Sequence, residues 1–205
     1  MSVTLDIRSK LVDGLLSFVV MFLLMGMLIV LMKPFEAIGG WGMWSYLVLM
    51  FALGIGTLWL SIQERFSEVG NAWLGILGGM CAWSVTEMAG ELGFVAVEDW
   101  DGIVLLLLTV ATTAVLWRFF PVGPKFWFVL LFLNWGGHVF IKLQRYIFAG
   151  QSLLETTYLL TVISLLLVIV AMLYWIFVRA TTRIQRLWSA VYIWSAVSII
   201  FFILR

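Results

Sequence analysis

The chain has 205 residues, of which 64% are hydrophobic and only 11% are charged, and its formal net charge is +1. A soluble domain of this size is nearer half apolar and a quarter charged, so the composition excludes an ordinary soluble domain. Nucleic-acid binding is not expected either, because the chain has no basic block and no acidic tail. The excess apolar surface predicts an integral membrane protein whose outer faces contact membrane lipids.

Seven apolar segments approach or reach the ~20 residues that an α-helix needs to cross a bilayer. The predicted spans are Leu11–Met32, Trp41–Ile62, Asn71–Val97, Gly102–Phe120, Phe126–Phe148, Thr157–Val178 and Leu187–Leu204. The first is long enough to span and is read as a transmembrane helix, not as a cleavable signal. We therefore expect an all-α, polytopic integral membrane bundle that forms one transmembrane domain over residues 1–205, with no soluble domain.

Glycine and proline residues mark the expected helix boundaries. The Lys33-Pro34 pair is expected to end the first span, and the Gly39-Gly40 pair precedes the second. Before the fifth span, Pro121, Gly123 and Pro124 predict a tight turn.

Lysine and arginine in the short loops predict the orientation in the membrane. With seven spans and a cytoplasmic N-terminus, eight of the 12 basic residues fall inside and four fall outside. The third loop, which is then external, carries Glu98, Asp99 and Asp101 without a cation. We expect the N-terminus in the cytoplasm, the C-terminus outside, and a location in a prokaryotic inner membrane.

Two of the spans carry stripes of polar residues, and these are the candidate site. Because a residue advances ~100° around a helix, each set forms a single face. The third span has Ser84, Glu87 and Glu91, and the fifth has Asn134, His138, Lys142 and Arg145. Ionisable groups in hydrocarbon cost several kcal/mol unless they are paired or hydrated, so the stripes predict a buried, complementary polar site.

With the proposed orientation, the acidic and basic stripes lie at similar depth in the outer half of the bilayer. If the two helices are neighbours, they form a pocket that opens outward and holds a proton, a quinone ring or a polar headgroup. The alternative is structural: the charges lock two helices together, or Lys142 and Arg145 extend to the interface. Asp13, near the cytoplasmic end of the first span, is expected to be solvated.

Small residues in the third span predict close helix packing. Gly75 and Gly79 form a small-xxx-small pair, and Gly90 lies further along the same span. Such packing would hold the acidic stripe at the centre of the bundle, away from lipid.

Cofactor chemistry is limited by the residue inventory. One cysteine, Cys81, excludes an internal disulfide, and one histidine, His138, excludes bis-histidine haem within the chain alone. No metal site is predicted from the spacing, and no catalytic motif is present. Quinone, haem or pigment is expected only together with partner chains.

These observations leave three functions open. We expect a non-catalytic membrane subunit of a larger complex of the respiratory or photosynthetic type, with other membrane subunits as partners. The first alternative is a small secondary transporter or channel, and the second is an intramembrane enzyme that acts on lipids. The subunit is favoured over the transporter because the strong polar residues cluster in the outer half, whereas a solute path must be lined throughout.

Overall fold

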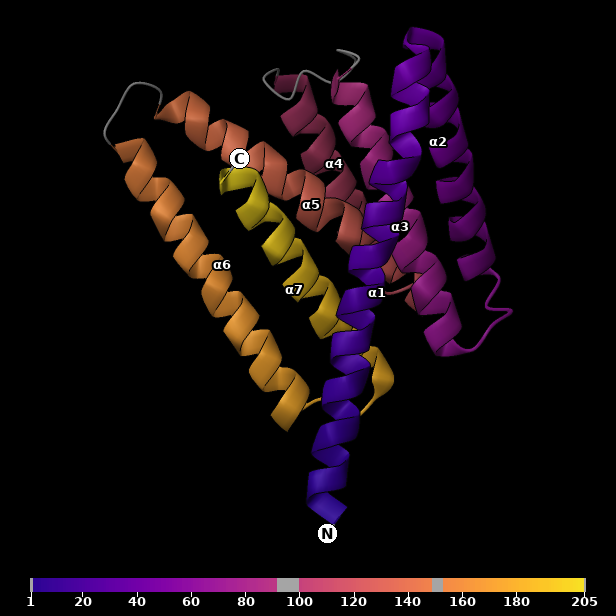
Figure 1. The fold of residues 1–205 in the computed structure, drawn as a ribbon, viewed down its shortest axis with the longest axis vertical. Helices are drawn as coiled ribbons and strands as arrows, with labels where there is room; N and C mark the ends of the chain where they lie inside the picture. Colours follow the sequence, from indigo (N-terminus) through magenta and orange to yellow (C-terminus); the bar gives the residue numbers. More distant parts are fainter. Residues whose placement is uncertain (1, 92–99, 149–152, 205) are drawn as a thin grey trace. The chain divides into compact units, whose positions relative to one another are not determined.

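The computed structural model describes residues 2–91, 100–148 and 153–204, and over these ranges it contains α-helices and no β-strand (Figure 1). The helices are α1 (Ser2–Ile38), α2 (Gly40–Ile62), α3 (Glu68–Glu91), α4 (Trp100–Leu116), α5 (Val122–Ile147), α6 (Leu153–Val178) and α7 (Arg183–Leu204). The predicted all-α class is confirmed. Within the helices, the side chains of residues 2–9, 11, 86–91, 100–106, 138, 142, 153 and 202 lie outside the description.

Five helical segments of the described chain are long and apolar enough to cross a membrane, which indicates an integral membrane protein. They are Val12–Ile38, Gly40–Ile62, Val122–Ile147, Leu154–Val178 and Arg183–Phe201. Helix α3, which carries three glutamates, and α4, which has 17 residues, are not among the five.

The end of the first helix differs from the sequence prediction. Pro34 lies inside α1, which continues to Ile38 instead of ending at the Lys33-Pro34 pair. A proline is tolerated in an apolar helix of this length because the neighbouring backbone can adjust around the one lost hydrogen bond. The chain turns at Gly39, whose φ of 84° favours glycine. The predicted Gly39-Gly40 boundary is therefore correct.

The start of the fifth helix also differs. Instead of forming a turn before it, Gly123 and Pro124 lie in the first turn of α5, and the Lys125 N–H donates to the Pro121 carbonyl. Proline is accepted there because the first N–H groups of a helix have no intrahelical partner.

The chain divides into two compact units. Unit 1 comprises residues 1–23 and 140–205, and unit 2 comprises residues 24–139. Unit 1 holds the first part of α1, the end of α5, and the hairpin of α6 and α7. Unit 2 holds the rest of α1, helices α2 to α4, and most of α5.

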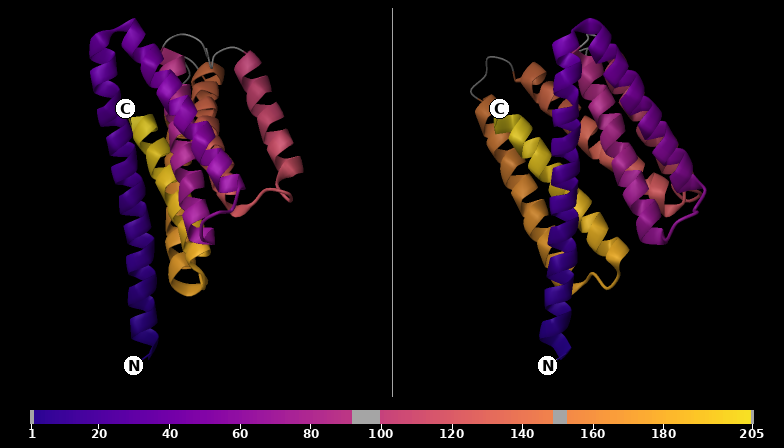
Figure 2. Two further views of the ribbon diagram at one scale, coloured as in Figure 1. Left: turned by 90° about the vertical axis from the view of Figure 1, so that its right-hand side faces the viewer. Right: turned by 45° about the vertical axis from the view of Figure 1, so that its right-hand side comes forward.

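The core of unit 2 forms where α2 and α3 pack side by side as an antiparallel hairpin (Figures 1 and 2). One face of α2 is buried, and its residues recur every three or four positions: Gly42, Tyr46, Met50, Gly54, Thr57 and Ser61. Helix α3 contributes Ile76 and Met80, and α5 contributes Phe126 and Leu130, all without solvent exposure.

In unit 1, α7 is the buried element and α6 is the exposed one. Leu187, Val191 and Trp194 of α7 are almost fully buried. In contrast, only 6% of the α6 span is buried, and Leu160 and Leu167 are among its many exposed apolar side chains. An apolar helix with this little burial is suited to lipid or to another transmembrane helix.

Candidate functional site

The predicted polar stripes lie on α3 and α5, and three of their side chains are described. Ser84 of α3 and Asn134 of α5, both in unit 2, are 6% and 0% exposed. Arg145, near the end of α5 in unit 1, is exposed. The side chains of Glu87, Glu91, His138 and Lys142 lie outside the described residues, and so do the surroundings of Gly90.

Ser84 belongs to a buried hydrogen-bond chain that joins α1, α2 and α3. The Tyr46 hydroxyl donates to the Leu28 carbonyl oxygen at 3.2 Å. Its oxygen lies 2.6 Å from Ser84 Oγ, so Ser84 donates when Tyr46 is bonded to the carbonyl. Each hydroxyl is thereby satisfied inside an apolar interior, where a lone hydroxyl would be costly.

Asn134 is the buried amide of the α5 stripe. Its Nδ2 donates to the Leu130 carbonyl oxygen, one helical turn earlier, at 2.7 Å. The side chain therefore folds back along its own helix and remains in the interior of unit 2.

Arg145 extends outward from α5. Its Nε donates to the Tyr158 hydroxyl of α6 at 2.8 Å, and next to it the buried Gln144 donates from Nε2 to Thr161 Oγ1 at 3.0 Å. These two bonds join α5 to α6 within unit 1. Arg145 thus contributes to helix pairing on an exposed face.

Glycines bring α3 and α5 into direct backbone contact in unit 2. A methyl group added to Gly75 would overlap the Gly123 carbonyl oxygen. One added to Gly79 would lie 2.9 Å from the Trp127 carbonyl oxygen and 3.2 Å from Leu130 Cβ. The contacts advance along both helices in the same direction, so α3 and α5 run parallel. Their first halves are in contact at a distance that only glycine permits.

The same end of unit 2 is also closed on the α2 side. A methyl group on Gly78 would overlap Thr57 Oγ1 and come within 2.5 Å of Trp127 Cδ1. Thr57 donates to the Leu53 and Gly54 carbonyls, and Ser61 donates to the Leu58 carbonyl. The hydroxyl groups of Thr57 and Ser61 are therefore satisfied by their own helix, whereas the buried Trp127 Nε1 has no hydrogen-bond partner among the described residues. We call the contact region formed by Thr57, Gly75, Gly78, Gly123 and Trp127 the glycine seal.

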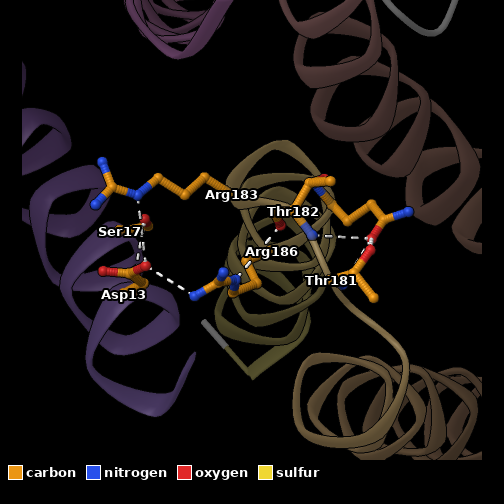
Figure 3. A network of polar contacts seen from close by, with 7 residues as sticks. Asp13, Ser17, Thr181, Thr182, Arg183 and Arg186 are labelled. Atoms are coloured by element: carbon orange, nitrogen blue, oxygen red, sulfur yellow. Dashed lines mark hydrogen bonds and ion pairs between the residues drawn. The ribbon is translucent and has the colours of Figure 1, made fainter. Parts of the chain in front are cut away.

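Unit 1 contains an ion-pair cluster between α1 and α7 (Figure 3). Asp13 Oδ2 accepts a hydrogen bond from Arg186 Nη1 at 2.8 Å and lies 3.8 Å from Arg183 Nε. The Asp13 side chain is 35% exposed and that of Arg186 is 11% exposed. The prediction of a solvated Asp13 is thus incomplete, because the carboxylate retains some contact with solvent but is also held by an arginine 173 positions away.

Sequence reasoning missed two of these residues, Tyr46 and Arg186. A signal for Tyr46 was present, because it belongs to the buried stripe of α2 that runs from Gly42 through Met50 and Gly54. Arg186 was counted only among the basic residues on the cytoplasmic side of the membrane. No pattern in the neighbouring sequence identifies its partner in α1.

The described residues contain no group of three or more His, Cys, Asp or Glu side chains that could hold a metal ion. Comparisons with protein-family models, with curated proteins and with solved structures find no match to this chain.

Proposed function

We propose that this protein is a non-catalytic integral membrane subunit of a larger complex of the respiratory or photosynthetic type. All seven helices span the membrane in this proposal, with the N-terminus in the cytoplasm and the C-terminus outside. Helices α3 and α5 enclose a polar pocket that opens toward the outside and takes a proton, a quinone or a polar headgroup.

The observation that carries the proposal is the glycine seal. It closes the interface of α2, α3 and α5 in the half of unit 2 that is cytoplasmic in the proposed orientation. The acidic and basic stripes follow in the second halves of the same two helices. A polar site above a closed base favours a half-site, meaning a site open to one side of the membrane only. A path for a hydrophilic solute would need polar lining through both leaflets.

The register of the parallel contact supports pairing between the two stripes. Gly75 meets Gly123, and Gly79 meets both Trp127 and Leu130. Eight residues further along each helix, Glu87 is therefore level with the turn from Trp135 to His138. This register supports heights within about one helical turn of each other, and we assign Glu87 and His138 as the proton-active pair of the pocket.

The chemistry of this pair suits proton exchange more than covalent catalysis. A carboxyl group in an apolar setting favours its neutral form, and an imidazole changes its charge near neutral pH. Ser84 and Asn134 are buried near the start of the second halves of α3 and α5. In this proposal they supply neutral hydrogen-bonding groups for a quinone carbonyl or a headgroup.

Extensive exposed apolar surface supports partners in the membrane. Helices α1 and α6 are buried over only 11% and 6% of their spans. Chains that assemble through transmembrane helices present such surfaces, since association in lipid needs packing and not a hydrophobic gradient.

Isolation from the native membrane tests the subunit proposal. The tagged chain, expressed at its natural level and extracted with mild detergent, should migrate as a complex in which other membrane chains occur at fixed stoichiometry. A monodisperse species that consists of this chain alone, under extraction conditions that preserve a known respiratory complex, would contradict the proposal.

Ion flux in proteoliposomes distinguishes the half-site from a transporter. The purified chain should carry no proton or solute flux above protein-free vesicles. Flux that is lost in Glu87→Gln or His138→Ala, but is kept in the matched surface variant Glu155→Gln, would establish transport and overturn the half-site.

A further inference from the structure

A groove in unit 1 between α6 and α7 lies outside the proposed pocket. It has a volume of about 300 Å³ and is lined by Met172, Trp175, Gln185, Trp188, Ser189 and Tyr192. This volume is at the lower end of the range for ligand pockets. The lining combines three aromatic rings and a methionine with only two small polar groups, so its occupant must be largely apolar.

The groove begins at the turn between the two helices and runs into their apolar parts. Trp175 lies four residues before Arg179, a separation of ~6 Å, and Met172 lies ~10 Å from it. Tryptophan and tyrosine are enriched at the depth where headgroups meet acyl chains. Trp175 is 44% exposed and Tyr192 is 37% exposed, so both rings remain accessible from the membrane.

Positive charge is concentrated at the same end. The turn and the start of α7 carry Arg179, Arg183 and Arg186. Arg183 and Arg186 point toward Asp13 of α1, where they share one carboxylate (Figure 3). Arg179 directly follows α6, and its N–H donates to the Trp175 carbonyl oxygen at 2.9 Å, so it continues the helical turn that carries Trp175, and it is exposed. The open end of the groove therefore has a net positive charge.

The turn that holds these charges is fixed by side-chain hydrogen bonds. Gln185 Oε1 accepts from the backbone N–H of Thr181 at 2.8 Å and of Thr182 at 3.2 Å, and the Gln185 N–H bonds to Thr182 Oγ1 at 3.2 Å. This reciprocal cap sets the entry angle of α7. The groove is thus formed by packed elements, which lowers the ordering cost of binding.

We propose that this groove is a binding site for one anionic membrane phospholipid. An acyl chain lies along Met172, Trp175 and Tyr192, and the phosphate pairs with Arg179 at the turn. Charge complementarity selects this occupant, because a guanidinium matches a phosphate geometrically and an apolar partner helix would leave Arg179 without a counter-charge. The site is independent of the polar pocket between α3 and α5.

Native mass spectrometry of the purified chain in detergent tests the site. Phosphatidylglycerol should remain bound in preference to phosphatidylcholine of the same acyl chains. Arg179→Gln should weaken phosphatidylglycerol binding on the order of fivefold, as expected for one arginine at a headgroup, and should leave phosphatidylcholine unchanged. The matched control, Arg118→Gln, removes an exposed arginine in unit 2 and should have no effect.

A second pair of variants tests the apolar part of the groove. Met172→Trp fills the groove and should reduce retention of both lipids, whereas Leu173→Trp on the neighbouring outward face should not. Equal binding of the two lipids, or the same affinities in Arg179→Gln and wild type, would overturn the proposal.

The native membrane gives an independent readout. A photoreactive amino acid in place of Trp175 should form cross-links to lipid. Cross-links to another protein chain would show that a partner occupies the groove and would overturn the lipid assignment.

Discussion

The helices within unit 2 and the helices within unit 1 are held together by different kinds of contact. In unit 2, the glycine seal brings α3 and α5 to backbone contact, and the interface leaves no space for a Cβ atom. In unit 1, only 6% of the α6 span is buried, and specific polar links such as Asp13–Arg186 and Gln144–Thr161 join the helices. The close contact between α3 and α5 leaves no space for a ligand, whereas the α6–α7 hairpin, which is little covered by other helices, has a groove between its two helices. The proposed function rests on this difference: unit 2 supplies the closed base of the pocket, and the exposed apolar side chains of α6 in unit 1 face lipid.

The largest expected difference between the two units is in the loss of stability when a leucine is changed to alanine. Leu130→Ala removes a fully buried side chain in unit 2 and should lower the free energy of unfolding by ~2–5 kcal/mol, through lost contacts and a residual cavity. Leu167→Ala, whose side chain is 64% exposed on α6, should change stability by less than ~0.5 kcal/mol. Denaturant titration in detergent measures both. Equal effects would show that α6 is covered within the folded chain.

A methyl group at the glycine seal should be the next largest perturbation. Gly75→Ala forces the Gly123 carbonyl away and should cost ~1–3 kcal/mol of unfolding free energy. Gly14→Ala in unit 1 is the matched variant, because its methyl group would meet side-chain atoms and no backbone: Ile176 Cγ2 at 3.3 Å and Cδ1 at 3.4 Å. It should cost well under half as much. Thermal unfolding in detergent compares them, and a neutral Gly75→Ala would rule out the backbone contact.

The two arginines that face Asp13 should contribute differently to stability, because one is largely buried and the other is exposed. Arg186→Gln removes the short, largely buried hydrogen bond and should destabilise unit 1 by ~1–2 kcal/mol. Arg183, whose side chain is 73% exposed, should contribute ~0–0.5 kcal/mol when changed to Gln. Proteolysis of the α6–α7 hairpin, measured as a function of salt, reports the difference. A larger effect for Arg183 would contradict the closer contact of Arg186 with Asp13.

Among the buried positions, removal of the Tyr46 hydroxyl should have the smallest effect on stability. Tyr46→Phe breaks the links to Leu28 and Ser84 and should cost ~1 kcal/mol, since hydrogen bonds between membrane helices contribute modestly. A double-mutant cycle with Ser84→Ala isolates the pair. Additive effects in the two single variants would indicate that these hydroxyls do not interact.

Much of the helical fold was predictable from hydropathy. Gly39-Gly40 also marked a boundary correctly, because a positive φ there needs glycine. Pro34 was misread because proline ends helices in water, whereas a long apolar helix tolerates it. Pro124 was misread because the first turn of a helix accepts a residue without an N–H.

The candidate site was predictable in part. The periodicity placed Ser84 and Asn134 on faces that are buried in the structure. Which helices touch is a tertiary property, so the parallel contact of Gly75 with Gly123 and the pairing of Asp13 with Arg186 could not be derived from local patterns. Gly78, which contacts both α2 and α5, resembles any other small residue in a transmembrane sequence.

Thiol accessibility in oriented membrane vesicles tests the central claim most directly. Single cysteines are placed by Glu87→Cys, His138→Cys and Thr57→Cys in a Cys81→Ala background, and a membrane-impermeant maleimide is applied to each side. We expect labelling at positions 87 and 138 from the external side alone, and none at position 57 from either side. Labelling of position 57 from the cytoplasmic side, or of position 138 from both sides, would contradict a closed base beneath an outward-facing pocket.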